Sequence, residues 1–430
     1  MYKQQVKNWG LYPTVEAEVF KSDQTDEIVS IVNDIPEALI ARGNGRCYGD
    51  SSLGQNIFET SRLNKFLSFD KSNGILHCQS GVLLSEILEV IVPQGYFLPV
   101  TPGTKFITVG GAIGADVHGK NHHVEGCFSD HVLFLDIITA DGHLVRCSQT
   151  ENAHLFWETC GGMGLSGIVI SAAIKLKEIH NSYIDQKIIK AGNLKEIMQL
   201  FEAHKESPYS VAWIDCLQKK HIGRSHLIVG NHAAPNDNLG FDLSKKKQLN
   251  IPFMFPSFAL NKYSVKAFNF SYYHKQISKI KANTVHYEGF FYPLDSLLNW
   301  NRIYGKSGFT QYQFVLPLDA SEEGLKVILK TIAESGEGSF LAVLKLFGRA
   351  NPNAIMSFPI KGYTLALDFK INPLVLRLLD KLDEIVAHYG GHLYLAKDAR
   401  MKPDFFHSSY GKKIKTCSKF QSLQSARLKI

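Results

Sequence analysis

The stretch TPGTKFITVGGAIGADVHGKNHH, residues 101–123, places glycine-rich main chain directly before a dense group of ionisable side chains. Glycines leave much of the first half without side chains, and the second half carries an aspartate, a lysine and three histidines. Bare main chain presents N–H groups that bind anions such as phosphates. The stretch therefore predicts a loop that holds a phosphate-bearing ligand beside reactive side chains.

Two more glycine-rich loops lie on either side of this stretch, ARGNGRCYGDSS at 41–52 and GGMGLSGIV at 161–169. The later loop has the glycine spacing of a dinucleotide-binding fingerprint. A helical pattern precedes it and a strand pattern follows, which reverses the order that such a fingerprint needs. One glycine-rich loop is usually a plain turn. Three loops within about 130 residues, two of which carry Arg or Lys, favour a bound diphosphate.

Composition narrows the class of protein. The chain has 430 residues, enough for two or three domains, and a net charge of +7. This charge suits a phosphate-bearing ligand or an anionic surface, and no nucleic-acid-binding motif accompanies it. The seven cysteines form no CxxC pair, which is typical of reduced thiols. Because neither a signal peptide nor a membrane-spanning run is visible, we expect a cytoplasmic protein. Since the binding motifs for nucleic acid and for zinc are missing, we expect neither nucleic acid nor a metal as a ligand.

Hydrophobic periodicity predicts an α+β protein. The first part alternates short strands and helices. After about residue 180 the elements are longer, in an order typical of a sheet with helices on one face. We expect strands at 37–41, 74–80, 167–179, 209–217 and 310–318, a hairpin at 131–147, and helices at 83–91, 151–160, 321–335 and 374–390.

The chain resembles the decaprenylphosphoryl-β-D-ribose 2-oxidase family in several segments: RGNGRCYGD, PGTKFITVGGAIGADVHGKNHH, GGMGLSG, SVAWIDC, AVLKLFG and YLAKDAR. These proteins are FAD-linked oxidases of the vanillyl-alcohol oxidase superfamily. The resemblance implies a two-subdomain FAD-binding fold with an inserted antiparallel-sheet substrate domain. It implies a PCMH-type FAD-binding domain at 1–180, a substrate domain at 181–391, and a C-terminal return segment of the FAD domain at 392–430.

The resemblance also implies which residues hold FAD. Relatives that attach FAD covalently use a histidine in the first glycine loop. Loop 41–52 has no histidine, so we expect non-covalent FAD, with a Cys47 linkage as the alternative. The residues expected to contact FAD are Ala41, Arg42, Gly43, Asn44, Gly45, Arg46, Cys47, Tyr48, Gly49, Asp50, Ser51, Gly103, Thr108, Val109, Gly110, Gly111, Ala115, Asp116, Val117, His118, Ile168 and Tyr394.

Three lysines far apart in the sequence, Lys120, Lys345 and Lys397, match family positions and together would surround a phosphate. Lys345 lies in the apolar segment AVLKLFG, where an unpaired ammonium is costly and a ligand partner is favoured. We expect His118, Lys120 and Lys397 to be catalytic. Lys397 would assist removal of the substrate hydroxyl proton if burial lowers its pKa.

Gln311 and Gln313 alternate in QYQFV, so both side chains point to the same face of a strand and suit sugar hydroxyls. His122 and His123 offer, with His118, only a weak metal motif, and we interpret both as structural hydrogen-bonding groups. The residues expected to contact the substrate are Tyr48, Tyr304, Gln311, Gln313, Lys345 and Asp368.

The resemblance implies an FAD-dependent oxidoreductase that oxidises the C2 hydroxyl of a polyprenyl-phosphate-linked ribose by hydride transfer to flavin N5. The keto sugar would pass to a separate NAD(P)-dependent short-chain reductase, which completes an epimerisation to arabinose. One alternative is an aldonolactone or alditol oxidase that acts on a free soluble sugar. Another is a flavin-binding protein without turnover.

Residues 250–273 are aromatic and contain two prolines, with Lys245, Lys246 and Lys247 just before them. One interpretation is a buried loop over the substrate domain. The alternative is a flap that touches the inner face of the membrane, with aromatic side chains in the interface and lysines at anionic headgroups. A polyprenyl-phosphate substrate would need such peripheral membrane contact.

Overall fold

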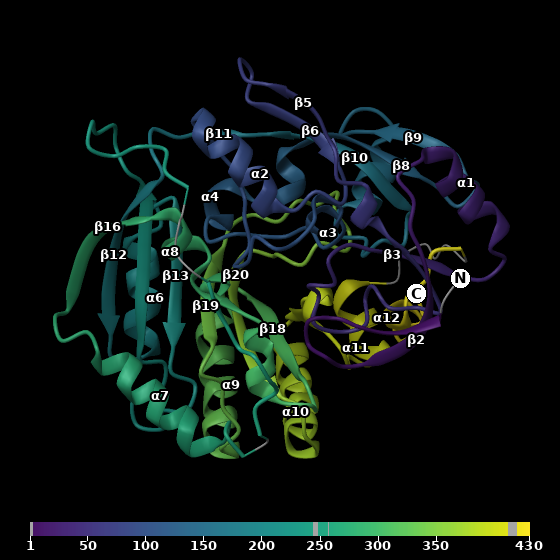
Figure 1. The fold of residues 1–430 in the computed structure, drawn as a ribbon. Coiled ribbons are helices and arrows are strands. Elements are labelled where there is room, and N and C mark those ends of the chain that lie inside the picture. Colours follow the sequence, from purple (N-terminus) through teal and green to yellow (C-terminus); the bar gives the residue numbers. More distant parts are fainter. Residues whose placement is uncertain (1–2, 244–247, 257, 412–418) are drawn as a thin grey trace.

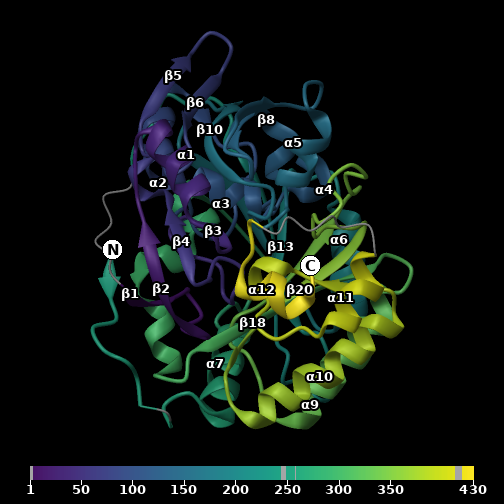
Figure 2. The same ribbon diagram turned by 90° about the vertical axis from the view of Figure 1, so that its right-hand side faces the viewer.

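The computed structural model describes residues 3–243, 248–256, 258–411 and 419–430. It is a mixed fold of helices and several separate sheets, which confirms the predicted α+β class (Figure 1). The N-terminal strands and the last helix lie side by side (Figure 2). Hydrogen bonds join them, since Gln421 N donates to Leu39 O (3.1 Å) and Leu423 N donates to Leu53 O (2.7 Å).

A four-stranded sheet carries the first glycine loop. Its first pair is antiparallel and the other two pairs are parallel. Helix α1 (Thr25–Asp34) buries Ile28 and Val32 in the same core cluster as Phe58. Loop 41–52 begins where the edge strand β3 ends. The strands across the sheet are β1 (Lys3–Lys7), β2 (Thr14–Phe20), β4 (Asn56–Glu59) and β3 (Leu39–Arg42).

A five-stranded antiparallel sheet follows, and it contains the predicted strand at 74–80 and the predicted hairpin at 131–147. The predicted strand at 167–179 is divided into β10 and a short β11 (Lys177–Glu178), which pairs with β7 (Tyr96–Phe97). Helices α2 (Leu84–Ile91) and α5 (Ala153–Thr159) lie where they were expected. The strands across the sheet are β5 (Phe66–Asp70), β6 (Ile75–Gln79), β10 (Ile168–Lys175), β8 (Val132–Ile138) and β9 (Leu144–Cys147).

The stretch 101–123 contains a short helix that the sequence pattern does not predict, α3 (Val109–Gly114). Its three glycines disfavour a helix. Thr108 Oγ1 accepts a hydrogen bond from Gly111 N (3.1 Å), and this cap offsets part of that cost. Ala112 and Ile113 are fully buried, so tertiary packing holds the glycine-rich main chain in place.

An eight-stranded antiparallel sheet forms the second half of the molecule. Helices α6 (Leu194–Ala203), α9 (Ser321–Ser335) and α10 (Pro373–His388) cover one of its faces (Figure 1). Tyr312 and Phe314 point to that side and join the helices in the largest core cluster. The strands across the sheet are β16 (Ile280–His286), β12 (Tyr183–Ala191), β14 (Ser225–His232), β13 (Tyr209–Ile214), β19 (Ala342–Phe347), β20 (Gly362–Lys370), β18 (Phe309–Pro317) and β21 (His392–Leu393).

The loop predicted over 250–273 is wrong for its second half, which forms helix α7 (Lys262–His274). Asn261 caps this helix, because its Oδ1 accepts hydrogen bonds from Tyr263 N (2.8 Å) and Ser264 N (3.2 Å). Both prolines precede the cap, so they do not interrupt the helix. The predicted lysine run, Lys245, Lys246 and Lys247, lies outside the described residues.

Short elements complete the fold. β15 (Leu249–Asn250) pairs in parallel with β17 (Leu297–Leu298). The short α-helices are α4 (His122–Glu125), α8 (Tyr287–Phe291), α11 (Pro403–Tyr410) and α12 (Leu423–Leu428). The 3-10 helices are η1 (Thr60–Arg62), η2 (Val92–Gln94), η3 (Phe128–His131), η4 (Pro293–Ser296), η5 (Trp300–Tyr304) and η6 (Leu395–Lys397).

Candidate active site

A cavity of about 420 Å³ lies between the glycine-rich loops and the sheet face that the helices leave free. Small-molecule sites in proteins have volumes of this order. Among the parts of the chain that line the cavity are loop 41–52, the stretch 101–120, strands β13, β18, β19 and β20, and residues 394–397 of the return segment.

Main chain without side chains forms one wall of the cavity, which we call the glycine wall. A Cβ atom on Gly103 would meet nothing within 4 Å apart from its chain neighbours, and one on Gly114 would meet only Gly164 N, at 3.7 Å. At Gly111 the single neighbour is Thr108 Oγ1, at 3.1 Å. A side chain at these positions would fill the cavity. The glycine wall therefore fits a large ligand such as FAD, laid against bare main chain.

Loop 41–52 adjoins this wall. Asn44 Nδ2 donates to Phe106 O (2.8 Å), which ties the loop to the stretch 101–123. The Arg46 guanidinium lies over the Trp9 ring (4.1 Å), which holds its positive charge at the cavity. The predicted FAD residues that line the cavity are Ala41, Gly43, Asn44, Gly45, Arg46, Cys47, Tyr48, Ser51, Gly103, Thr108, Gly110, Gly111, Ala115, Val117, His118 and Tyr394.

Other predicted FAD residues are not among those that line the cavity. Arg42 Nη2 donates to Lys7 O (3.0 Å). Asp116 is fully buried and accepts hydrogen bonds from Ser129 N (3.1 Å) and Ser357 Oγ (2.5 Å). The predicted FAD residues outside the lining are Arg42, Gly49, Asp50, Val109, Asp116 and Ile168.

His118 lies where the glycine wall meets the eight-stranded sheet. Its ring is 5% exposed and contacts Phe347 and Tyr394, with ring centres 4.8 and 5.1 Å away. Burial lowers the pKa of His118 well below its ordinary value, and the charges of Lys345 and Lys397 act in the same direction. His118 is therefore a neutral imidazole at physiological pH.

Hydrogen bonds determine which nitrogen of His118 carries the proton. Thr364 Oγ1 donates to Phe314 O (2.8 Å), so its oxygen accepts from Gln313 Nε2 (3.3 Å). The same Gln313 nitrogen is 3.1 Å from His118 Nε2, which must then accept. The proton of His118 consequently lies on Nδ1, a buried atom without a hydrogen-bond partner among the described residues.

Three lysines from distant parts of the chain reach this cavity: Lys120 after the glycine wall, Lys345 on β19 and Lys397 in η6. Burial lowers the pKa of Lys345 to about 8. Burial and the nearby Lys345 charge lower the pKa of Lys120 to about 7. Lys120 Nζ donates to Phe290 O. In the described ranges no carboxylate forms an ion pair with Lys345. Two buried lysines at one cavity, Lys120 and Lys345, that have no ion pair with a carboxylate in those ranges indicate a place for an anion.

Asp368 and Tyr304, predicted to contact the substrate, are not among the residues that line the cavity. Gln311 Nε2 lines the cavity and donates to Asp368 Oδ1 (2.5 Å), and Tyr304 OH donates to Oδ2 (3.5 Å). Burial raises the pKa of Asp368 and lowers the pKa of Lys397, while their mutual attraction opposes both shifts. Lys397 Nζ also lies 3.9 Å from the centre of the Tyr48 ring.

His122 and His123 are held by main chain. His122 Nδ1 accepts from Gly348 N (3.1 Å), and His123 Nε2 is 2.9 Å from Ser207 O. These contacts account for both side chains as structural groups. Across the described ranges, no cluster of three or more His, Cys, Asp or Glu side chains has an arrangement that suits a metal ion.

Several cavity residues, Trp213, Val343, Thr364 and Tyr272, were not singled out from the sequence. Trp213 pairs with Val343, and Val343 pairs with Ala366, so the three form one row across the sheet. Thr364 lies two residues before Ala366 and faces the same side, and Tyr272 reaches the cavity from α7. Alternation along each strand would identify such residues only when the strand pairing is known.

Known proteins are similar to this chain in sequence. A model of the FAD binding domain matches residues 14–148. Decaprenylphosphoryl-beta-D-ribose oxidase from Mycolicibacterium smegmatis is 36% identical over 94% of this chain and 90% of its own length. D-lactate dehydrogenase from Anaerostipes hadrus is 26% identical over 54% of this chain and 52% of its own. L-gulonolactone oxidase from Scyliorhinus torazame is 25% identical over 48% of this chain and 47% of its own.

Proposed function

Because the chain belongs to the decaprenylphosphoryl-beta-D-ribose oxidase family, we propose that it oxidises the C2 hydroxyl of a ribose linked to a polyprenyl phosphate. The chain is an FAD-dependent oxidoreductase, and FAD is its cofactor. The proposed product is a keto sugar, the first half of an epimerisation to arabinose. The observation that carries the proposal is the convergence of Lys120, Lys345 and Lys397 on one cavity.

The lysine group supports a phosphate on the substrate. Buried ammonium groups are costly unless an anion or other partner joins them. A phosphate beside Lys120 and Lys345 would supply that charge and would raise the pKa values of these two lysines back toward the ordinary range. A neutral free sugar leaves the charges of Lys120 and Lys345 uncompensated. The lipid phosphate is therefore the substrate feature that this wall of the cavity favours.

Residues around the cavity suit the oxidation of an alcohol. Bound FAD supplies the acceptor that takes a hydride from the carbinol carbon. Lys397 takes the hydroxyl proton, since its lowered pKa makes the neutral amine available near physiological pH. The His118 ring lines the cavity, and Gln313 holds its orientation. Gln311 and Gln313 hold sugar hydroxyls from one face of β18.

We propose that FAD is held without a covalent bond. Loop 41–52 contains no histidine, and the Cys47 thiol pairs with Ser52 Oγ at 3.2 Å. Acid precipitation should then release the yellow colour into solution, whereas colour that stays with the precipitate would indicate a Cys47 linkage. We further propose that residues 1–180 and 392–430 form the FAD-binding unit around the substrate domain at 181–391.

We propose that a separate NAD(P)-dependent short-chain reductase carries out the second step of the epimerisation, the reduction of the keto sugar. The only dinucleotide-like glycine spacing of the chain lies at 162–167, in a turn from α5 into β10. Gly164 and Gly167 of this turn line the same cavity as the other glycine loops. This segment is therefore part of the FAD site and gives no support to a second cofactor site.

Anaerobic titration of the bound flavin separates the proposal from its alternatives. The similarity to L-gulonolactone oxidase over about half the chain favours oxidation of a free sugar as the second candidate. We expect polyprenyl-phosphoryl ribose to bleach the flavin at low concentration and free aldonolactones or alditols to have little effect. Bleaching by the free sugar instead would favour the second candidate, and no bleaching by either would favour a binding protein.

We also propose peripheral membrane contact through the surface formed by residues 249–256 and 258–281, called here the α7 surface. It contains five lysines and no aspartate or glutamate. Large apolar side chains are exposed along it, among them Phe258 (76%), Tyr263 (71%) and Ile277 (96%). Apolar side chains beside lysines suit an anionic bilayer. Of the helices in the described ranges, none has the length and apolar character needed to cross a membrane.

Flotation with vesicles tests this contact. Full-length protein should float with vesicles of phosphatidylglycerol and phosphatidylcholine, and less with phosphatidylcholine alone. Replacing Phe258 and Tyr263 by Ser should reduce flotation. The matched control replaces Phe66 and Leu67, which are exposed on β5 (40% and 47%), and should leave flotation unchanged. Equal flotation of both double variants would exclude the α7 surface as the contact.

A further inference from the structure

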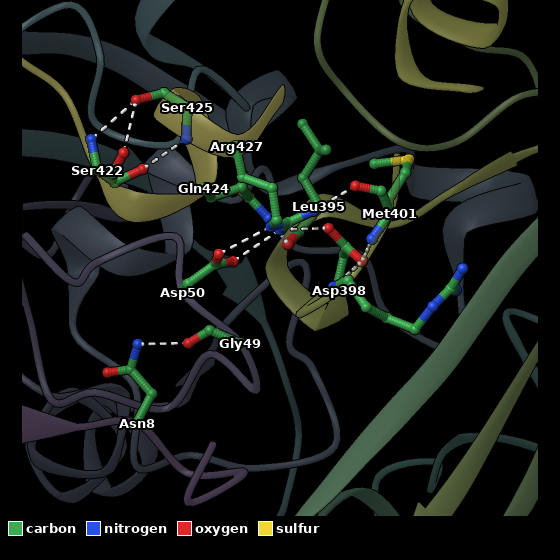
Figure 3. Close-up of polar contacts among 11 residues, drawn as sticks. Asn8, Gly49, Asp50, Leu395, Asp398, Met401, Ser422, Gln424, Ser425 and Arg427 are labelled. Atoms are coloured by element: carbon green, nitrogen blue, oxygen red, sulfur yellow. Dashed lines mark hydrogen bonds and ion pairs between the residues drawn. The ribbon is translucent and has the colours of Figure 1, made fainter. Parts of the chain in front are cut away.

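One arginine near the C-terminus joins two segments of the cavity wall (Figure 3). Arg427 Nε and Nη2 donate to the two oxygens of Asp50 (2.9 and 2.8 Å), and Nη2 also donates to Asp398 Oδ2 (2.7 Å). Nη1 donates to Met401 O (2.5 Å). Only 5% and 2% of the two carboxylate side chains are exposed, so these ion pairs are shielded from water. We call Arg427, Asp50 and Asp398 the clasp.

Each carboxylate of the clasp lies close in sequence to a residue of the cavity. Asp398 follows Lys397 directly, and Asp50 comes two residues after Tyr48. Tyr48 N donates to Ala396 O (3.0 Å), and Lys397 Nζ lies 3.9 Å from the centre of the Tyr48 ring. The clasp therefore lies directly behind the contact between Lys397 and Tyr48.

The two segments joined by the clasp touch through their main chains. A Cβ atom on Gly49 would lie 1.8 Å from Asp398 O, so only glycine fits at this position. Asn8 Nδ2 donates to Gly49 O (2.8 Å) and holds the loop from its other side. Because the approach is this close, any separation of the two segments displaces Lys397 relative to Tyr48.

Helix α12 carries Arg427 and is bonded independently to both segments. Leu423 N donates to Leu53 O (2.7 Å), just after the first glycine loop. Gln424 Nε2 donates to Leu395 O (2.8 Å), in the return segment. These bonds remain when Arg427 is replaced, so a substitution there removes the clasp without removing the helix.

We infer that Arg427 is a positioning residue, which acts through Asp50 and Asp398 to hold the Lys397 ammonium against Tyr48 in the cavity. The inference rests on the proposed function only for the role of Lys397 in the reaction. A guanidinium suits this position because its planar fork binds two carboxylates at once. Burial raises the pKa of the Asp50 carboxyl, and the Arg427 charge opposes that rise and keeps the carboxylate form.

Selective acetylation of the purified full-length protein with acetic anhydride tests the inference. Mass spectrometry gives the labelling of Lys397 relative to Lys345, which faces the same cavity from β19. In Arg427→Met we expect this ratio to rise about tenfold, the factor that loss of a charge-assisted hydrogen bond implies for local opening. Arg427→Lys keeps the positive charge, but its ammonium reaches only one of the two carboxylates. Its labelling ratio should therefore lie between the ratios of the wild type and Arg427→Met.

Arg224→Met is the matched control, because Arg224 forms a comparable buried ion pair with Asp215 (2.7 Å) beside the eight-stranded sheet. It should lower the melting temperature and leave the labelling ratio unchanged. An unchanged ratio in Arg427→Met contradicts the inference. An equal rise in labelling of both lysines also contradicts it, because general loosening exposes both.

Two further measurements keep the outcome decisive. If Arg427→Met does not fold, Asp50→Asn can replace it, because this substitution removes one partner of the clasp. The labelling of Lys397 relative to Lys345 then tests the inference in the same way. The flavin content of each sample is measured in parallel. A colourless wild-type protein would contradict the proposed function, whereas the labelling ratio would still decide whether the clasp holds Lys397.

Discussion

The glycine wall meets the cavity with main chain at Gly103, Gly111 and Gly114, whereas the sheet wall meets it with side chains such as Gln313 and Lys345. On the glycine wall the absence of side chains leaves the space that a large cofactor needs. On the sheet wall amides and ammonium groups are suited to a smaller, charged group. We therefore propose that the glycine wall holds FAD and that the sheet wall holds the substrate.

This difference between the walls also predicts what an amino-acid substitution on each wall does to ligand binding. A side chain added to the glycine wall competes directly with the cofactor for space. A side chain shortened on the sheet wall leaves the cofactor in place and removes one contact to the substrate. Substitutions on the two walls should therefore separate loss of flavin from loss of turnover.

The largest effect is expected at the glycine wall. Gly103→Leu should yield folded but colourless protein, because the new side chain extends into the cavity and meets no protein group. The measurement is flavin absorbance per protein after gel filtration. Gly289→Leu is the matched control, since a Cβ atom there also meets nothing within 4 Å but lies outside the cavity lining. A yellow Gly103→Leu protein would refute the role of this wall.

The next largest effect is expected at Lys397. Lys397→Met should retain FAD and lower kcat by about 10²- to 10⁴-fold, the usual contribution of a general base. Rapid-reaction kinetics of flavin reduction measure this change. Lys381→Met removes an exposed lysine of α10 and should have no effect. If kcat is unchanged in Lys397→Met, another group removes the proton.

A smaller effect is expected from pH on anion binding to the sheet wall. Sulfate, whose charge is constant in this range, should bind oxidised protein about tenfold more weakly at pH 9 than at pH 7. The anion stabilises protonated lysines, and Lys120 and Lys345 lose their protons as pH rises through about 7 and about 8. The affinity for sulfate is therefore highest at pH values below these two pKa values, and it is lost as pH rises above them. Calorimetry that finds no pH dependence would place the anion elsewhere.

Elements with a regular pattern could be predicted from the sequence. The helix expected at 321–335 forms α9 over those same residues, since its apolar residues recur at helical spacing. Helix α3 could not be predicted, because its glycines oppose a helix and only a threonine cap and tertiary packing hold it. Helix α7 was missed because aromatic residues and two nearby prolines masked its Asn261 cap.

The residues of the candidate site also fall into two groups, those that the sequence identifies and those that only the structure identifies. Lys345 was recognisable from the sequence as a charge inside an apolar strand, and the structure places it at the cavity. Asp368 and Tyr304 were expected beside the substrate, but neither lines the cavity. The register of β18 and β20 pairs Asp368 with Gln311, whose side-chain amide donates to the carboxylate. The clasp joins Arg427 to Asp50 across most of the chain, a contact that no local pattern indicates.

Anaerobic flavin reduction by polyprenyl-phosphoryl ribose, in wild-type protein and in Lys345→Met, tests the division of the cavity most directly. We predict that both proteins bind FAD equally and that Lys345→Met needs about 10- to 100-fold more substrate for half-maximal reduction, through loss of a charge-assisted contact. Lys361→Met, at the exposed end of the same sheet, should match the wild type. Equal substrate dependence in wild type and Lys345→Met would contradict the account.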